Sequence, residues 1–227
     1  LTVRLRDAST APHTIDGTRF GRYALVDEYS LRVGLRTVEV RSGKLLLNGK
    51  PLYLRGIHMH GDSPLRGRGD DDVHNLVDVQ ALVAAHANWV RIHPPPSEAL
   101  LDLLDEAGIL VSAEVPAIGM RSPPGLGGAA FAADRINGST LAAHVRYVKE
   151  YVARDKNRAC VLLWSVANEP ATDEAASEPY FAALLNASRA LDPQRRPLTY
   201  VTNRDVANDL AALHVDLLCV NRYYGWY

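Results

Sequence analysis

The chain has 227 residues, enough for one large domain or for one domain and part of another. Its 25 Lys and Arg against 26 Asp and Glu give a formal net charge of −1, so neither nucleic acid nor a membrane surface is indicated as a partner. Apolar residues make up 47% and charged residues 22%, which excludes a disordered chain, and no apolar run approaches the ~20 residues that span a bilayer.

The chain ends and the two cysteines do not define the cellular compartment of the protein. The chain begins at Leu1 without a basic and apolar leader segment and stops at Tyr227. We therefore expect a piece of a longer polypeptide, and we leave the compartment open with the cytoplasm favoured. Cys160 and Cys219 lie in apolar runs without Cys-x-x-Cys spacing, which favours two buried thiols over a disulfide or a metal site.

The first 45 or so residues predict β structure. Residues 31–40 and 44–54 are rich in β-branched and alternating apolar side chains, and no helical period occurs before residue 70. The Asn48-Gly49 pair predicts a two-residue hairpin, because both positions tolerate a positive φ. We interpret residues 1–45 as the end of a β domain that runs into the next domain.

From about residue 52, short apolar strands alternate with helical stripes. Strands are predicted at residues 52–58, 88–92, 109–115, 161–167, 198–202 and 216–221. Helical stripes run from Leu76, Leu100, Leu141 and Tyr180, and Gly108 is expected to end the second helix. Strict alternation implies parallel strands with right-handed crossovers, and hence an α/β fold.

Polar and aromatic residues cluster directly after the predicted strands. The clusters are residues 58–62, 91–93, 114, 168–169 and 221–227. In a (β/α)8 barrel all the strand ends form one ring, whereas an open doubly wound sheet joins only some of them, so the pattern favours the barrel. The chain lacks a Gly-x-Gly-x-x-Gly segment after the first strand and a Gly-Lys-Ser/Thr phosphate loop, so no nucleotide cofactor is indicated.

The segment from Trp164 to Pro170 (WSVANEP) delivers a carboxylate to the end of an apolar strand. A partly desolvated carboxyl there can have a raised pKa and act as a general acid, with Asn168 holding a substrate hydroxyl. On spacing alone, a solvated Glu169 at the start of a loop is an equally good interpretation. The aromatic residues at the C-terminal end likewise suit either stacking on a sugar or ordinary packing.

Four segments resemble glycoside hydrolase family 2, whose members are retaining (β/α)8 glycosidases. Residues 162–170 (LLWSVANEP) resemble its acid/base motif, and residues 154–157 (RDKN) resemble its segment before the fourth barrel strand. Residues 29–56 resemble the junction between an immunoglobulin-like sandwich and the barrel. Residues 221–227 (NRYYGWY) are similar to the sixth-strand motif of the family's β-glucuronidase branch.

This resemblance implies an incomplete (β/α)8 TIM barrel over residues 46–227, with about six of eight strands, after an immunoglobulin-like part at 1–45. It implies a retaining exo-glycosidase that hydrolyses terminal β-glycosides, with β-D-glucuronides favoured. The partner would be a carbohydrate substrate, with no cofactor, no metal, no nucleic acid and no membrane. A homo-oligomeric parent protein is left open.

The family's functional residues transfer to matching positions of this sequence. Glu169 would be the general acid/base, and Asn168 would hold the sugar 2-hydroxyl. Tyr223 would lie against the nucleophile, and Asn221 and Tyr227 would line the pocket.

Positions after the first three strands match less completely. His60 and Asp62 match two positions of a His-Glu-Asp substrate motif in which Gly61 replaces the Glu. Arg91 matches the arginine that supports the nucleophile. Residues 91–96 (RIHPPP) depart from the family's Arg-x-x-His-Tyr-Pro, so the match of His93 to the substrate-facing histidine is open by one residue. Glu114 is expected to be pocket scaffolding rather than the nucleophile.

His58-x-His60 also has the form of a metal pair, but no third ligand follows at a suitable spacing, so hydrogen-bonding roles are expected. The nucleophile is missing too. Retaining hydrolysis needs two carboxylates about 5–5.5 Å apart. The family's Glu-Tyr-Gly nucleophile segment does not occur in these residues, so we expect it downstream and expect this fragment alone to be inactive.

Three alternatives to a β-glucuronidase stay open. One is a β-galactosidase-like relative, and another is a non-catalytic carbohydrate-binding protein on a decayed barrel, which the altered 91–96 loop would suit. An aldolase or metal-dependent hydrolase on the same fold is less favoured, because Lys149 and Lys156 precede the fourth strand rather than follow a strand.

Overall fold

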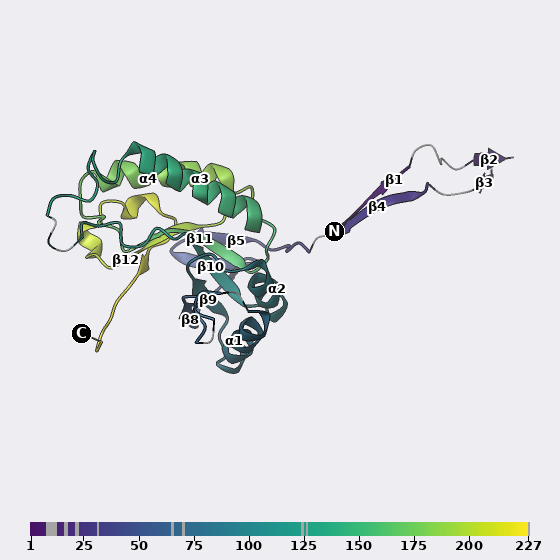
Figure 1. Cartoon of the computed structure of the whole chain (residues 1–227), viewed down its shortest axis with the longest axis horizontal. Helices are drawn as coiled ribbons and strands as arrows, with labels where there is room; N and C mark the ends of the chain where they lie inside the picture. The colour runs from purple at the N-terminus through teal and green to yellow at the C-terminus, as the bar shows by residue number, and fades with distance from the viewer. Residues whose placement is uncertain are drawn as a thin grey trace. The chain divides into compact units, whose positions relative to one another are not determined.

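A computed structural model describes residues 1–7, 13–15, 18–20, 23–30, 32–64, 66–69, 71–123, 125 and 127–226. Its contacts divide the chain into two units, Leu1–Gly34 and Leu35–Tyr227, and the second unit carries the parallel sheet and the helices (Figure 1). None of the helices in the described part of the chain combines the length and the apolar character that crossing a bilayer requires.

The first unit consists of antiparallel strand pairs, as its β-rich composition predicts. Strand β1 (Thr2–Arg6) pairs with β4 (Leu25–Ser30), and β2 (His13–Ile15) pairs with β3 (Thr18–Phe20). Its origin in an immunoglobulin-like sandwich stays a prediction, as does the domain boundary after residue 45.

A three-stranded antiparallel sheet opens the second unit. It comprises β5 (Val38–Arg41), β6 (Lys44–Leu47) and β7 (Lys50–Pro51). The predicted hairpin at Asn48-Gly49 is confirmed: the two residues join β6 to β7 with φ of 51° and 74°. The Asn48 side chain also accepts a hydrogen bond from the Thr37 backbone N–H at 3.0 Å, which ties the turn to the residue directly before β5.

Six parallel strands form the main sheet of the second unit. They are β8 (Gly56–Met59), β9 (Trp89–Ile92), β10 (Leu110–Glu114), β11 (Val161–Asn168), β12 (Leu198–Thr202) and β13 (Cys219–Val220). They lie side by side in chain order. An open doubly wound sheet reverses its order at a switch point, whereas a barrel does not. The prediction of an incomplete TIM barrel with six strands is therefore confirmed.

Four helices connect the strands: α1 (Asp72–Ala84), α2 (Glu98–Ala107), α3 (Gly138–Asp155) and α4 (Ser177–Leu191). Side chains of Asp71, Ser97 and Asn137 accept hydrogen bonds from the first backbone N–H groups of α1, α2 and α3, as helix N-caps do. Gly108 ends α2 in the left-handed region, with φ of 69°, as predicted.

Strands β9 and β10 are one or two residues shorter than the sequence predicts, and β8 and β13 differ more. Strand β8 begins at Gly56 rather than at residue 52, and β13 covers Cys219–Val220 rather than 216–221. Before β13, the Asp216 carboxylate accepts a hydrogen bond from the Leu198 backbone N–H at 2.8 Å. Asp216 therefore caps the start of β12 with its side chain, and β13 begins only after it.

The core lies between the sheet and the helices. It is formed by apolar side chains of the strands, such as Val90, Val111 and Val161, packed against Leu104 and Leu184 of the helices. Both cysteines are free thiols, as expected. Cys160 is buried and Cys219 is partly buried, and burial raises the pKa of both thiols.

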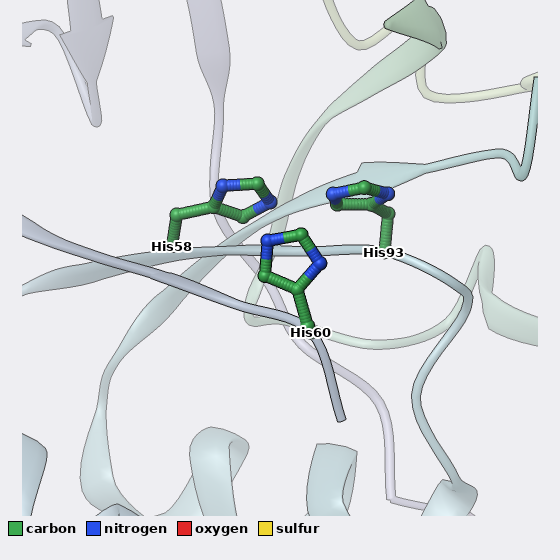
Figure 2. Close-up of side chains that lie close together, drawn as sticks. All are labelled: His58, His60 and His93. Carbon is green, nitrogen blue, oxygen red and sulfur yellow. The ribbon is translucent and has the colours of Figure 1, made fainter. Parts of the chain in front are cut away.

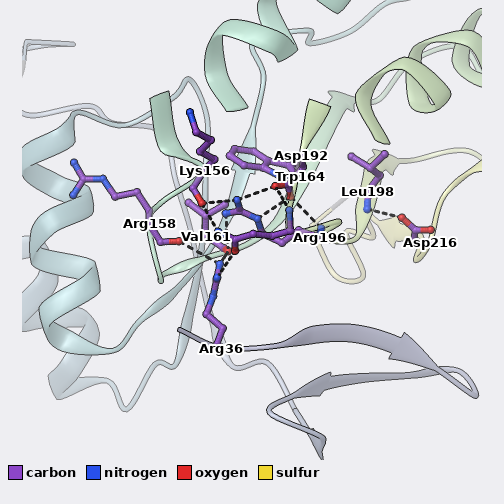
Figure 3. A network of polar contacts seen from close by, with 10 residues as sticks. Arg36, Lys156, Arg158, Val161, Trp164, Asp192, Arg196, Leu198 and Asp216 are labelled. Atoms are coloured by element: carbon purple, nitrogen blue, oxygen red, sulfur yellow. Dashed lines mark hydrogen bonds and ion pairs between the residues drawn. The ribbon is translucent and has the colours of Figure 1, made fainter. Parts of the chain in front are cut away.

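At the amino end of β11 a buried polar network joins three segments of the chain (Figure 3). The Arg196 guanidinium lies over the Trp164 ring at 4.8 Å and donates to the Asp192 carboxylate, which also accepts from the Trp164 indole N–H at 2.9 Å. Arg36, which precedes β5, donates to the Val161 carbonyl in the same network. These contacts fix the β5–β7 sheet to the end of the barrel opposite the polar clusters.

Candidate active site

Polar side chains from four strands converge at the carboxyl ends of the sheet. Arg91 comes from β9, Glu114 ends β10, Asn168 ends β11 with Glu169 directly after it, and Asn221 follows β13. Because the strands are parallel and in chain order, their ends lie along one edge.

A buried ion pair forms the base of this site. Arg91 donates to Glu114 through Nε at 3.1 Å and Nη2 at 2.8 Å, and the Ser165 hydroxyl donates to the same carboxylate at 2.7 Å. Both partners are shielded from solvent, with side chains 9% and 0% exposed. Burial raises the pKa of Glu114, against the opposing effect of Arg91 and Ser165.

Arg91 also orients the two asparagines. Its Nη2 donates to Asn168 Oδ1 at 2.6 Å, and its Nη1 donates to Asn221 Oδ1 at 3.1 Å. The Asn221 amide in turn donates to Asn168 Oδ1 at 3.1 Å and to Glu169 Oε1 at 2.7 Å. The arginine and the two amides therefore form one connected network that reaches Glu169.

Three hydrogen-bond donors hold the Glu169 carboxylate. Oε1 accepts from the Asn221 amide and from the Tyr223 hydroxyl, the latter at 2.7 Å, and Oε2 accepts from Asn203 Nδ2 at 3.0 Å. The residues that supply these donors, Asn203, Asn221 and Tyr223, also line part of an open hollow of about 590 Å³, and the Glu169 side chain that they hold is half-buried. A fixed carboxylate beside a space for a ligand can give a proton to a bound group and take one back.

Three histidines form a second cluster beside Arg91 (Figure 2). The ring centroids of His58 and His60 are 4.3 Å apart, and each lies 4.6 Å from the ring of His93. Desolvation of the rings, reinforced by the Arg91 charge, lowers the pKa of the exposed His58 to about 3 and that of the buried His93 to about 4, so these two rings are neutral at pH 7.

The structure brings five of the residues predicted for the site into direct contact. These are Arg91, Asn168, Glu169, Asn221 and Tyr223. Tyr223 donates to Glu169, and its expected contact with the nucleophile stays a prediction.

The other predicted residues have different nearest neighbours in the described part of the chain, although His93 Nδ1 lies 3.8 Å from Glu114 Oε1. His60 and His93 belong to the histidine cluster, and exposed Asp62 pairs with Arg68 at 3.3 Å. Tyr227 lies outside the described residues. Sequence reasoning missed Asn203, although it directly follows β12, the position at which the neighbouring strands also place their site residues.

A parallel barrel whose strand ends converge on an Asn-Glu pair defines a TIM-barrel domain with a carboxylate-based site. Residues 38–227 match the model of the TIM barrel domain of glycosyl hydrolases family 2, and the chain belongs to this family. Membership confirms the family resemblance that the sequence motifs suggest.

Among curated relatives, the chain is 41% identical over 215 residues to a β-glucuronidase of Streptococcus agalactiae, with 89% of this chain and 35% of that protein covered. It is 40% identical over 205 residues to the β-glucuronidase of Mus musculus, covering 90% of this chain and 30% of that protein.

Solved structures agree with the curated relatives. The β-D-glucuronidase of Dictyoglomus thermophilum is similar with a TM-score of 0.84 and 42% identity over 88% of this chain and 35% of that one. That of Bifidobacterium dentium, complexed with coumarin-3-O-glucuronide, has a TM-score of 0.81 and 38% identity over 90% of this chain and 32% of that one. The chain thus spans about a third of the length of these proteins.

Proposed function

We propose that the protein containing this chain is a retaining β-glucuronidase and that the chain supplies its general acid/base, Glu169. The observation that carries the proposal is the Glu169 carboxylate itself, held by three donors at the end of β11 next to Asn168. The names of relatives about 40% identical, one of them complexed with a glucuronide, support the reaction and the sugar.

The proposed reaction divides the work between two carboxylates. In the first step a nucleophilic carboxylate attacks the anomeric carbon, the bond to the aglycone oxygen breaks, and Glu169 gives its proton to that oxygen. In the second step Glu169 takes a proton from a water molecule that attacks the same carbon and releases the nucleophile. We place the nucleophile outside the 227 residues.

The neighbouring groups suit supporting roles in this scheme. Asn168, oriented by Arg91 at 2.6 Å, would present its amide N–H groups to a sugar hydroxyl, because its carbonyl oxygen is already in use. Glu114 accepts from both Arg91 and Ser165, which suits a carboxylate that positions Arg91 rather than one that attacks a sugar.

The first test is turnover by the full-length protein of 4-nitrophenyl β-D-glucuronide against the corresponding β-D-galactoside. We expect the glucuronide to be cleaved with the larger kcat/KM. Preference for the galactoside would favour a β-galactosidase-like relative. Binding of glycans by a folded protein that cleaves neither compound would favour a non-catalytic one.

Substitution Glu169→Gln tests the acid role. General acid catalysis contributes about 10²–10⁴-fold, and only a poor leaving group needs it. We expect hydrolysis of alkyl or phenyl glucuronides to slow by about this factor, and that of 2,4-dinitrophenyl glucuronide to slow far less in its first step. The matched control is Glu150→Gln on the exposed side of α3, which should leave both rates unchanged. Equal slowing of all substrates by Glu169→Gln would refute the acid role.

A further inference from the structure

We propose that His58, His60 and His93 form a binding site for a divalent transition metal of the zinc, copper or nickel class. One potential ligand atom from each residue lies within 4.8 Å of the others. Figure 2 shows the three rings turned toward one another, each with a nitrogen facing the space between them. The proposal does not rest on the glycosidase reaction, and it gives His60 and His93 a role other than the substrate contacts that the family resemblance implies for them.

The pairing of β8 with β9 brings His93 next to the other two histidines. His60, one residue past the end of β8, continues the alternation of that strand and lies on the same side as His58, with the two ring centroids 4.3 Å apart. The register pairs His58 with Arg91 and Met59 with Ile92, and the next step along both strands places His60 level with His93. Sequence spacing hid this ligand, because it comes from the neighbouring strand.

His93 is the anchor of the proposed site. The residue is only 3% exposed, and within the described part of the chain neither nitrogen of its ring has a hydrogen-bond partner. A buried polar group without a partner is costly, and a metal bond would satisfy one of these nitrogens. His58 and His60 are exposed and can adjust around this fixed ligand.

The required adjustment is small. In a tetrahedral site with metal–nitrogen distances of about 2.0–2.1 Å, ligand nitrogens lie about 3.3 Å apart, which asks the rings to approach by about 1.5 Å at most. Three imidazole ligands with an open fourth position suit zinc, copper and nickel, whereas magnesium and calcium prefer oxygen ligands.

The positive charge of Arg91 next to the histidine cluster would disfavour a bound cation, but a neighbouring carboxylate reduces this effect. Glu114 pairs with Arg91 and offsets its charge. The Glu114 Oε1 atom also lies 3.8 Å from His93 Nδ1. Metal-bound histidines commonly direct their second ring nitrogen toward a carboxylate, so this geometry leaves His93 Nε2 for the metal.

The test is zinc binding by the full-length protein that contains this chain, purified without a polyhistidine tag and stripped with a chelator. Zinc is titrated in competition with a chromophoric chelator, bound metal is measured by elemental analysis, and Co²⁺ is added separately to record its visible ligand-field bands. We expect one zinc per chain, Co²⁺ bands of a nitrogen-ligated site, and no comparable binding of Mg²⁺ or Ca²⁺.

The variants are His58→Asn, His60→Asn and His93→Asn, each checked by circular dichroism. Loss of an outer partner of a metal ligand already costs about 10–100-fold in affinity, so each variant should weaken zinc binding by about 100-fold or more. The control is His86→Asn, because His86 is exposed with φ of 55°, which asparagine tolerates.

Less than one zinc per chain, or equal weakening by His86→Asn, would overturn the proposal. Unchanged affinity in His58→Asn and His60→Asn would do the same. Since these two side chains are exposed, the pair decides the matter even if His93→Asn fails to fold.

Discussion

Neutralising Glu114 measures how far the site depends on its buried ion pair. Glu114→Gln preserves the shape of the side chain but removes the negative charge, which accepts two hydrogen bonds from Arg91 and one from Ser165 at 2.7–3.1 Å. Loss of one partner of a buried pair costs about 3–5 kcal/mol, because the other charge is left uncompensated. We expect about 3 kcal/mol, the lower end, since the carbonyl oxygens of Asn168 and Asn221 still accept from Arg91.

Urea unfolding followed by circular dichroism gives this free energy. With a slope of about 2–3 kcal/mol per molar urea, a loss of about 3 kcal/mol moves the midpoint by about 1–1.5 M. The double variant Arg91→Met/Glu114→Leu should be more stable than Glu114→Gln, because it removes both charges at once. A loss below about 1 kcal/mol in Glu114→Gln, or a double variant less stable than either single change, would refute this reasoning.

Two further predictions concern the barrel itself. A Cβ at Gly56 would lie 1.7 Å from the Trp89 carbonyl oxygen, so Gly56→Ala should lower the free energy of unfolding in urea by at least the ~1–3 kcal/mol that overpacking costs. The control Gly138→Ala should change stability little, because a Cβ there meets open space. Tolerance of both substitutions would contradict the close approach of β8 to β9. Burial lowers the pKa of His144, which bonds to the Val166 carbonyl at 2.8 Å, below its ordinary value of 6.5. As the pH falls below 6.5, His144 is protonated in the unfolded chain before it is protonated in the folded one, so the free energy of unfolding should decrease. His144→Gln should show a smaller decrease between pH 7 and pH 5.

Periodicity was sufficient to predict the helices and the barrel strands, because these elements are defined by local sequence and by continuous burial. The Asn48-Gly49 hairpin and the Gly108 helix end were predictable for the same reason, since each depends on the backbone freedom of one or two residues. Strand ends were less predictable. The Asp216 carboxylate, rather than a backbone carbonyl, accepts the hydrogen bond of the Leu198 N–H, and no local sequence pattern predicts this.

The site residues divide in the same way. Glu169 and Asn168 stand in one recognisable segment, and family resemblance supplies their expected roles. The role of Asn203 could not be predicted from local sequence, because its contact with Glu169 joins residues 34 positions apart and depends on the pairing of β12 with β11. The meeting of His60 with His93 depends on the register of two strands, which composition and spacing do not encode.

Glu169 occupies the left-handed region of backbone space with φ of 53°, where residues other than Gly, Asn and Asp are disfavoured by about 1 kcal/mol or more. Glycine at this position would relieve that strain and asparagine would reduce it, yet neither could carry a carboxylate to the place where the three donors meet. Selection for thermal stability alone would therefore drive position 169 away from glutamate. In the proposed acid/base role, Glu169 therefore bears a cost in backbone conformation in return for placing its carboxylate among the three donors.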